Sequence, residues 1–254
     1  VTVIEMLDHI GGPTDAEISE ILLKNYKKKG VEFMLGAKVT AVGTKSVSCE
    51  FLGKPLEVEA DCVLCAVGRR ANAIGIGLEN IGVLCERGAV ITNEQGRTSV
   101  AGVWAAGDVN GKSMLAHTAY REGEVAINDM FGKKDAMHYI SIPSVIYTNP
   151  EVASVGETSE SIKAKGIEAE TRSLTMRYSG RYVAENEGGD GIVKIIVDKA
   201  HRRVLGVHMI GSYASEIIYG AAMMVENEMR VEDVRKFVFP HPTVCEVIRE
   251  AMFD

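Results

Sequence analysis

A chain of 254 residues, 46% hydrophobic and 25% charged, has the composition of an ordinary globular protein with room for more than one core. Its formal net charge of −7 argues against general affinity for nucleic acid or anionic membranes, and its apolar runs are too short to span a membrane. The sequence opens without an initiator Met or a secretory signal, inside a strand pattern, so we expect it to be entered partway along a longer protein.

The amino-terminal third predicts part of a doubly wound, Rossmann-like α/β unit. Val1 to Glu5 is a buried-strand pattern, and Thr14 to Glu17 is a capping box that opens a helix running to Lys29. Short strands are predicted over residues 31–35, 38–42, 46–51 and 56–60. The continuous apolar run from Cys62 to Val67 predicts a parallel strand that is buried on both faces and ends at Gly68.

The carboxylate that closes the first strand is a candidate nucleotide ligand. In doubly wound units an acidic residue at the end of the second strand bonds the adenosine ribose, and it repels a 2′-phosphate. Glu5 therefore favours NAD over NADP as the bound nucleotide. A solvated glutamate at a strand end is the structural alternative.

The cysteines give no sign of a metal centre or a disulfide framework. Their number is odd and their spacing irregular, which favours a reducing cytoplasm; they are Cys49, Cys62, Cys65, Cys85 and Cys245. Cys62 and Cys65 have CxxC spacing, but residues three apart on a strand point to opposite faces. We therefore predict neither a zinc site nor a redox pair there.

The central segment contains a second candidate ligand site. A strand over Val103 to Ala106 ends in Gly107-Asp108, where a carboxylate can accept hydrogen bonds from sugar-like hydroxyls. A helix then opens near Met114 and runs to about Phe131. Its first amides, near Leu115, Ala116 and His117, can face an electron-rich ligand edge. The structural alternatives are a turn aspartate and a histidine of the cap region.

The remainder predicts an α+β domain with an antiparallel sheet and helices on one side. The predicted strands cover residues 142–147, 169–174, 191–198 and 203–210, and the predicted helices cover 159–165, 215–228, 231–237 and 244–252. A polar linker, Gly132 to Asp135, precedes this domain.

The last of these helices follows a histidine held between two prolines. Pro240 and Pro242 predict a rigid, extended loop at His241, and Glu246 lies on the following turn. A carboxylate beside one imidazole nitrogen fixes the tautomer, which suits a general acid–base. Thr243 to Glu246 also has the form of a capping box, so a purely structural role stays open.

Three motifs in this order, residues 63–70, 103–108 and 241–246, make the chain resemble the flavoprotein pyridine nucleotide–disulfide oxidoreductases, most closely the branch that oxidises dihydrolipoamide. Residues 147–156 also resemble the opening of that family's interface domain. The resemblance implies FAD on Asp108 and on the amides near Leu115, Ala116 and His117, and NAD on Gly68 and Glu5, with Arg69 a weaker candidate. It implies that His241, oriented by Glu246 and followed by a cis peptide bond to Pro242, is the acid–base serving the partner subunit of a homodimer.

This resemblance divides the chain into three parts. Residues 1–72 would complete an NAD-binding domain, 73–140 would be the second FAD-binding segment, and 141–254 would be the interface domain through which the homodimer forms. The parent enzyme would take dihydrolipoamide or a lipoyl domain as substrate. The family's first FAD fingerprint, its C-x4-C redox disulfide and the first NAD glycine loop are missing and are expected before Val1. A non-catalytic dimerisation module and the mercury-reducing branch of the family are the alternatives.

Overall fold

The computed structural model describes residues 1–253, which form two compact units. The first unit joins Val1–Leu64 to Pro143–Asp254, and the second is Cys65–Ile142. Within the described residues, no helix is both long and apolar enough to cross a bilayer.

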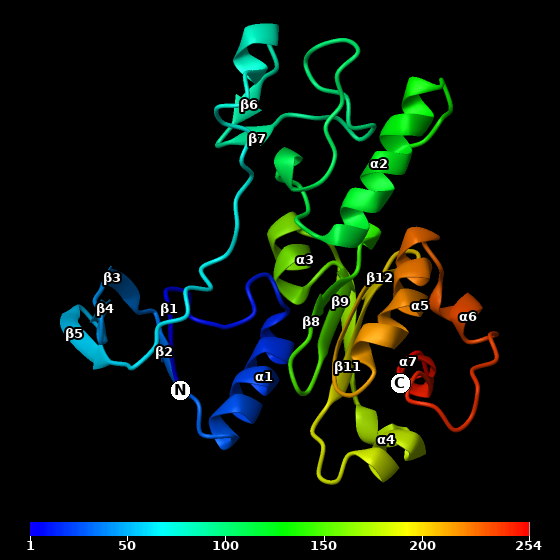
Figure 1. The fold of residues 1–254 in the computed structure, drawn as a ribbon. Helices are drawn as coiled ribbons and strands as arrows, with labels where there is room; N and C mark the ends of the chain where they lie inside the picture. The colour runs from blue at the N-terminus through cyan, green and yellow to red at the C-terminus, as the bar shows by residue number, and fades with distance from the viewer. Residues whose placement is uncertain (254) are drawn as a thin grey trace. The chain divides into compact units, whose positions relative to one another are not determined.

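The first unit begins with a parallel β–α–β piece (Figure 1). Strand β1 (Thr2–Glu5) pairs in parallel with β2 (Glu32–Leu35), and helix α1 (Ala16–Lys28) connects the two strands. This arrangement confirms the predicted Rossmann-like α/β pattern. The predicted capping box is wrong by one residue. Asp15, not Thr14, caps α1 by accepting the Glu17 N–H, because the Thr14 hydroxyl donates to the Gly11 carbonyl instead.

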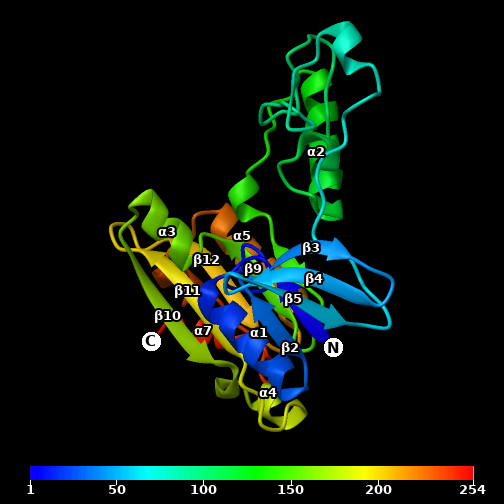
Figure 2. The same ribbon diagram turned by 90° about the vertical axis from the view of Figure 1, so that its left-hand side faces the viewer.

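The next three predicted strands form an antiparallel meander, and Figure 2 shows them side by side: β3 (Lys38–Val42), β4 (Ser46–Phe51) and β5 (Lys54–Glu59). The buried strand predicted from Cys62 to Val67 is absent, and Leu64 and Val67 are 90% and 89% exposed. Such a strand needs neighbours for its N–H and C=O groups and layers on both faces. Nothing among residues 1–253 pairs with this segment, so it stays irregular.

The rest of the first unit is built on a five-stranded antiparallel sheet, which confirms the α+β prediction. Its strands in spatial order are β10 (Ala169–Thr175), β11 (Ile192–Asp198), β12 (Val204–Ile210), β9 (Val152–Gly156) and β8 (Ser144–Ile146). The helices of this part are α3 (Ser159–Lys165), α4 (Gly180–Glu185), α5 (Ala214–Glu226), α6 (Val231–Val234) and α7 (Glu246–Glu250), with a 3-10 turn at Met176–Tyr178.

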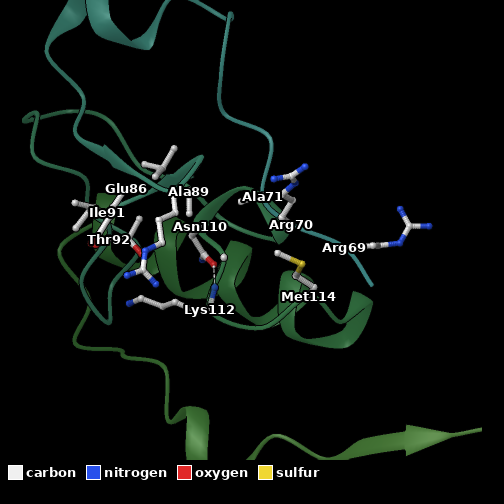
Figure 3. Close-up of a pocket in the computed structure, with 13 residues that line it drawn as sticks. Arg69, Arg70, Ala71, Glu86, Ala89, Ile91, Thr92, Asn110, Lys112 and Met114 are labelled. Atoms are coloured by element: carbon white, nitrogen blue, oxygen red, sulfur yellow. Dashed lines mark hydrogen bonds between the residues drawn. The ribbon is translucent and has the colours of Figure 1, made fainter. Parts of the chain in front are cut away.

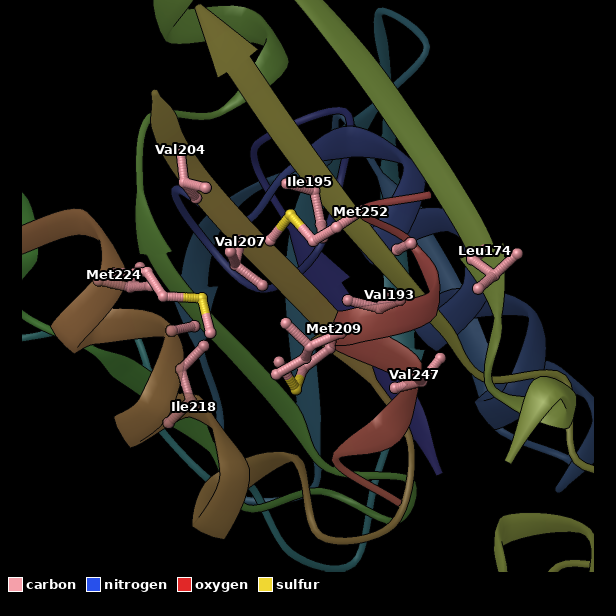
Figure 4. Packing of buried hydrophobic residues seen from close by; sticks show 14 of the residues in the cluster. Leu174, Val193, Ile195, Val204, Val207, Met209, Ile218, Met224, Val247 and Met252 are labelled. Carbon is pink, nitrogen blue, oxygen red and sulfur yellow. The ribbon is translucent and has the colours of Figure 1, made fainter. Parts of the chain in front are cut away.

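Both faces of this sheet are covered. Helices α5 and α7 pack on one face over the main core, whose members include Val193, Met209, Ile218, Val247 and Met252 (Figure 4). Helix α1 lies against the other face, where Ile18 and Leu22 contact Val152 and Ile210 (Figures 1 and 2). The prediction of helices on one side therefore holds for α5 and α7 but not for the sheet as a whole, because α1 covers the other face.

The second unit is smaller and poorer in strands. It contains β6 (Cys85–Glu86), β7 (Ala89–Val90), helix α2 (Ala116–Met130) and 3-10 turns at Leu78–Ile81, Asp108–Asn110 and Tyr139–Ser141. The strand predicted over Val103 to Ala106 is wrong, because only Trp104 pairs, through a single bridge to Arg97. The core of this unit gathers around Ala73, Val83 and Val90.

Candidate functional site

His241 and Glu246 meet as the proline pattern predicted. The Nδ1 atom of His241 lies 2.6 Å from Glu246 Oε1, and the peptide bond between His241 and Pro242 is cis, which confirms that expectation. A carboxylate only accepts hydrogen bonds, so Nδ1 carries the hydrogen and the Nε2 lone pair is left to take up a proton. The His241 side chain is 78% exposed, whereas Glu246 is 19% exposed.

The second oxygen of Glu246 performs the structural role that the sequence left open. Its Oε2 accepts the Thr243 backbone N–H at 2.8 Å, which is one half of a capping box. The other half is missing, since the Thr243 hydroxyl donates to the Pro240 carbonyl. The Thr243 N–H bond, opposed by partial burial and assisted by the His241 hydrogen bond, keeps the pKa of Glu246 below its ordinary value.

Helix α7 holds Glu246 in place because its other face is buried. Val247, Ile248 and Met252 are at most 1% exposed within the main core. At the far end of the helix, Arg172 and Arg235 donate to the Met252 carbonyl. A five-residue helix is unstable alone, so this packing is what fixes the pair.

The second unit brings Asp108 beside the start of α2. Gly107, at φ 83°, precedes Asp108, and a Cβ at Gly107 would lie 3.3 Å from the Cβ of Ala119 in the first turn of the helix. The Asp108 side chain is exposed, as are Ala116 and His117, and Leu115 supplies no side-chain cap. The turn and the helix amides therefore form one hydrogen-bonding surface.

Sequence reasoning missed the residue that builds this surface. Glu122 is 2% exposed, and its carboxylate accepts from the Gly107 N–H, the Asn110 amide and the Tyr139 hydroxyl. Burial raises the pKa of Tyr139, and the hydrogen bond to the Glu122 carboxylate raises it further. The available signal was a glutamate on the apolar stripe of α2, one turn from Thr118 and Val125.

The remaining candidates occupy separate places. Glu5 ends β1 half-buried, and its Oε1 accepts the Leu7 N–H at 2.9 Å, which leaves Oε2 for a ligand. Gly68 lies in the second unit with φ 92°. Glu5 and the His241–Glu246 pair thus belong to one unit, and Gly68 and Asp108 belong to the other.

An open cavity of about 430 Å³ in the second unit has four cationic side chains and one carboxylate, Glu86, in its lining. Figure 3 shows Arg69, Arg70 and Lys112 around it together with Asn110, and Arg87 also contributes. Guanidinium groups favour phosphate and carboxylate ligands. The cavity therefore suits an anionic ligand, and it includes Arg69.

Comparisons with known proteins agree along the whole chain. The family described as "Pyridine nucleotide-disulphide oxidoreductase" matches residues 1–123, and its "dimerisation domain" matches residues 142–252. A dihydrolipoyl dehydrogenase of Rhizobium etli is 37% identical over 100% of this chain and 54% of its own length. The mitochondrial dihydrolipoyl dehydrogenase of Pisum sativum is 36% identical over 99% and 51%. The chain spans about half the length of the curated relatives it matches.

Solved structures show the same architecture. LpdA from Mycobacterium tuberculosis has a TM-score of 0.88 and 27% identity, over 100% of this chain and 56% of its own. The HOCl-induced flavoprotein disulfide reductase RclA from Escherichia coli has a TM-score of 0.84 over 100% and 59%. At 22% identity the likeness to RclA shows the fold alone.

Proposed function

The chain belongs to the pyridine nucleotide–disulphide oxidoreductases, and on that premise we propose that it supplies the C-terminal half of an FAD-containing, NAD-dependent dihydrolipoamide dehydrogenase. The observation that carries this proposal is the His241–Glu246 pair, with its 2.6 Å contact and exposed imidazole, on a dimerisation domain. The names of the 36–37% identical relatives support the choice of substrate.

In this proposal His241 is the base for the dithiol. Its Nε2 atom takes the thiol proton, which leaves the thiolate that is the reactive form of sulfur in disulfide exchange. Glu246 holds the other nitrogen protonated, so the ring presents the tautomer whose Nε2 can accept the proton.

The residues present fit part of each cofactor site. Asp108 would bond the ribityl chain of FAD, and the amides of Leu115, Ala116 and His117 would face the pyrimidine edge of the flavin. The close approach of Gly107 to Ala119 supports this, because any larger residue would separate the turn from the helix. When bound, FAD and NAD supply the electron and hydride transfer chemistry.

Glu5 would hold the adenosine ribose of NAD through Oε2. From the family resemblance, Gly68 is proposed as an NAD-binding residue, with Arg69 as the weaker candidate. The carboxylate favours NAD because a 2′-phosphate would be repelled. The boundaries 1–72, 73–140 and 141–254 are proposed with these roles.

The dimerisation domain implies a homodimer. We place the interface within residues 141–254 and assign His241 to the active site of the partner subunit. The imidazole is exposed on this chain, so it is accessible to a second subunit. We also place the protein in the cytoplasm, since all five cysteines are free thiols.

A second description fits the 254-residue chain taken alone, namely a dimerisation module without catalysis. No cysteine of residues 1–253 is paired, and Cys62 and Cys65 lie in an exposed irregular segment rather than at a redox centre. A visible absorption spectrum separates the descriptions, because stoichiometric bound flavin contradicts the module.

The test of the catalytic assignment is His241→Gln in the full-length enzyme. We expect turnover of dihydrolipoamide to fall by roughly 10²–10⁴-fold, the usual loss of a general base, with flavin content unchanged. His201→Gln is the matched control, because His201 also contacts a carboxylate, Asp198, and is exposed. Near-wild-type turnover in His241→Gln overturns the assignment.

A further inference from the structure

A row of polar side chains crosses the face of the five-stranded sheet that lies under α1. The ladder pairs Ser173 with Lys194, Lys194 with His208, and His208 with Ser154. Directly paired residues point to the same face, so these four form one line, the polar row. Lys194 is 6% exposed and His208 is 1% exposed, although their neighbours Ile192 and Ile210 belong to the apolar cluster beneath α1.

The amino terminus of α1 closes over one end of the polar row. Asp15 is fully buried, and its Oδ1 accepts from Lys194 Nζ at 2.8 Å while its Oδ2 accepts from the Ser159 N–H at 3.2 Å. Glu17 adds an ion pair to Lys194 at 3.1 Å and accepts from Ser173. One carboxylate thus joins α1, the start of α3 and strand β11.

These contacts hold the charges in place despite burial. Burial pushes the pKa of Asp15 upward, but the Lys194 ammonium and the Ser159 N–H outweigh it, and the pKa lies below its ordinary value. Burial likewise pushes the pKa of Lys194 downward, and Asp15 and Glu17 reverse that effect. Asp15 and Lys194 are therefore both charged near neutral pH.

At the other end of the polar row, buried polar atoms lack hydrogen-bond partners among the described residues. His208 Nε2 lies 2.7 Å from the Glu157 carbonyl, which only accepts, so Nε2 carries the hydrogen and Nδ1 is a bare lone pair. Within residues 1–253, neither His208 Nδ1 nor the Ser154 hydroxyl, both buried, has a hydrogen-bond partner. A proton arriving at Nδ1 would place a second cation beside Lys194 without an acceptor.

The charges that face His208 come from three elements. Asp15 caps α1, Lys194 lies on β11, and Glu160 lies on α3, while Glu17 on α1 pairs with Lys194. Burial is the largest influence and lowers the pKa of His208. The hydrogen bond to the Glu157 carbonyl and the Asp15 and Glu160 carboxylates act against burial, whereas Lys194 acts with it.

The sign of the pH effect follows from that lowered pKa. Where α1 is undocked and water reaches the ring, the imidazole titrates near its ordinary value of 6.5. Below that pH the undocked form binds a proton that the docked form does not, so docking weakens as pH falls toward the lower, docked pKa. Above it the docked state has its full stability.

We propose that Asp15, Lys194 and His208 form a proton-sensitive docking site, which holds α1 on the sheet while His208 is neutral and releases α1 when His208 is protonated. The site is separate from the His241–Glu246 pair and requires neither cofactor nor substrate. It couples the β–α–β piece, whose first strand ends in Glu5, to the sheet of the dimerisation domain.

Hydrogen exchange of the 254-residue chain at pH 7.5 and pH 5.5 tests this proposal, with rates corrected for intrinsic exchange. The protection of α1 amides should fall roughly tenfold relative to α5, because a single group with an ordinary pKa near 6.5 changes the opening equilibrium by that factor. His208→Gln keeps an N–H for the Glu157 carbonyl but takes up no proton, so it should abolish the fall. His201→Gln, on the exposed turn between β11 and β12, should retain it.

An NMR titration of the His208 ring in the wild-type chain gives a second readout that does not depend on any variant folding. A midpoint below 6.5 supports the docking site. A midpoint at or above 6.5 overturns it, as does an equal loss of α1 protection in His208→Gln.

Discussion

A single carboxylate, Glu246, performs two tasks with its two oxygens. One oxygen orients the His241 ring and the other accepts the Thr243 N–H, so the proposed catalytic role and the structural role are not alternatives at this residue. Each role depends on the other, because the carboxylate can face His241 only while the Thr243 contact fixes its rotamer.

The acid stability of the first unit should depend on Glu246. Its pKa is lowered, first by the Thr243 N–H, so its contribution is present above its ordinary value of 4.5 and is lost as pH falls through the lower folded value. Glu246→Gln keeps an oxygen for Thr243 but has no proton to gain. We expect wild type to have the larger free energy of unfolding at pH 7, and the difference between wild type and variant to shrink toward pH 3. Urea unfolding followed by circular dichroism measures both.

Glu250→Gln is the control for that series, because Glu250 lies on the same helix and forms its ion pair with the adjacent residue, Arg249, at 3.2 Å. The difference in free energy of unfolding between Glu250→Gln and wild type should change less with pH. A Glu246→Gln difference that stays constant from pH 7 to pH 3 would mean that the carboxylate contributes nothing through its charge.

Strands β9 and β12 depend on a close approach of two backbones. A Cβ at Gly206 would overlap the Glu157 carbonyl oxygen, and a Cβ at Gly156 would overlap that of Leu205. The same Glu157 carbonyl accepts the His208 hydrogen bond. A side chain at Gly206 would therefore separate β9 from β12 and at the same time displace the carbonyl that His208 in the polar row is bonded to.

Gly206→Ala should destabilise the first unit by roughly 2–4 kcal/mol, the range of substitutions that force backbone apart in a packed core. Gly180→Ala is the matched control, because a Cβ at this first residue of α4 meets nothing within 4 Å, and its effect should be within about 1 kcal/mol. Urea denaturation of both variants measures the difference. Equal stabilities would show that β9 and β12 can move apart without cost.

Local pattern predicted the elements whose partners are close in sequence. Helix α3 begins and ends at the predicted residues, Ser159 and Lys165, because a capping residue and Gly166 mark its ends. Strands β11 and β12 begin within one residue of their predicted starts and end where predicted, and they pair with each other across a short turn. The run from Cys62 to Val67 failed because burial on both faces depends on neighbouring strands, which no local pattern reports.

At the scale of the whole molecule, the contacts that sequence reasoning missed join residues far apart in the chain. The His241–Glu246 pair was predictable, because two prolines and a spacing of five residues define it locally. The Asp15–Lys194 contact joins residues 179 apart, and the three hydrogen bonds of Glu122 converge from two different turns. Buried polar residues on apolar stripes are the only sequence signal for such sites, and they do not identify the partner.

The surface that would contact a second copy of the chain is also a property of the whole molecule. Helix α5 buries Ile218, Ala221 and Val225 against the sheet but exposes Tyr219 and Met223, which are 68% and 50% exposed. These two residues are one helical turn apart, so they form an apolar stripe on the dimerisation domain. An exposed apolar stripe on a helix of this domain is a candidate for the proposed interface.

Met223→Glu should therefore weaken the homodimer at least tenfold, because burying an unpaired carboxylate costs more than about 1.4 kcal/mol. Sedimentation across a concentration series measures the dissociation constant. Met130→Glu is the matched control, since Met130 is an exposed methionine on α2 in the other unit, and it should leave the dimer unchanged. If both variants dissociate like wild type, α5 lies outside the interface, and the path by which His241 reaches a partner subunit must run through another face of residues 141–254.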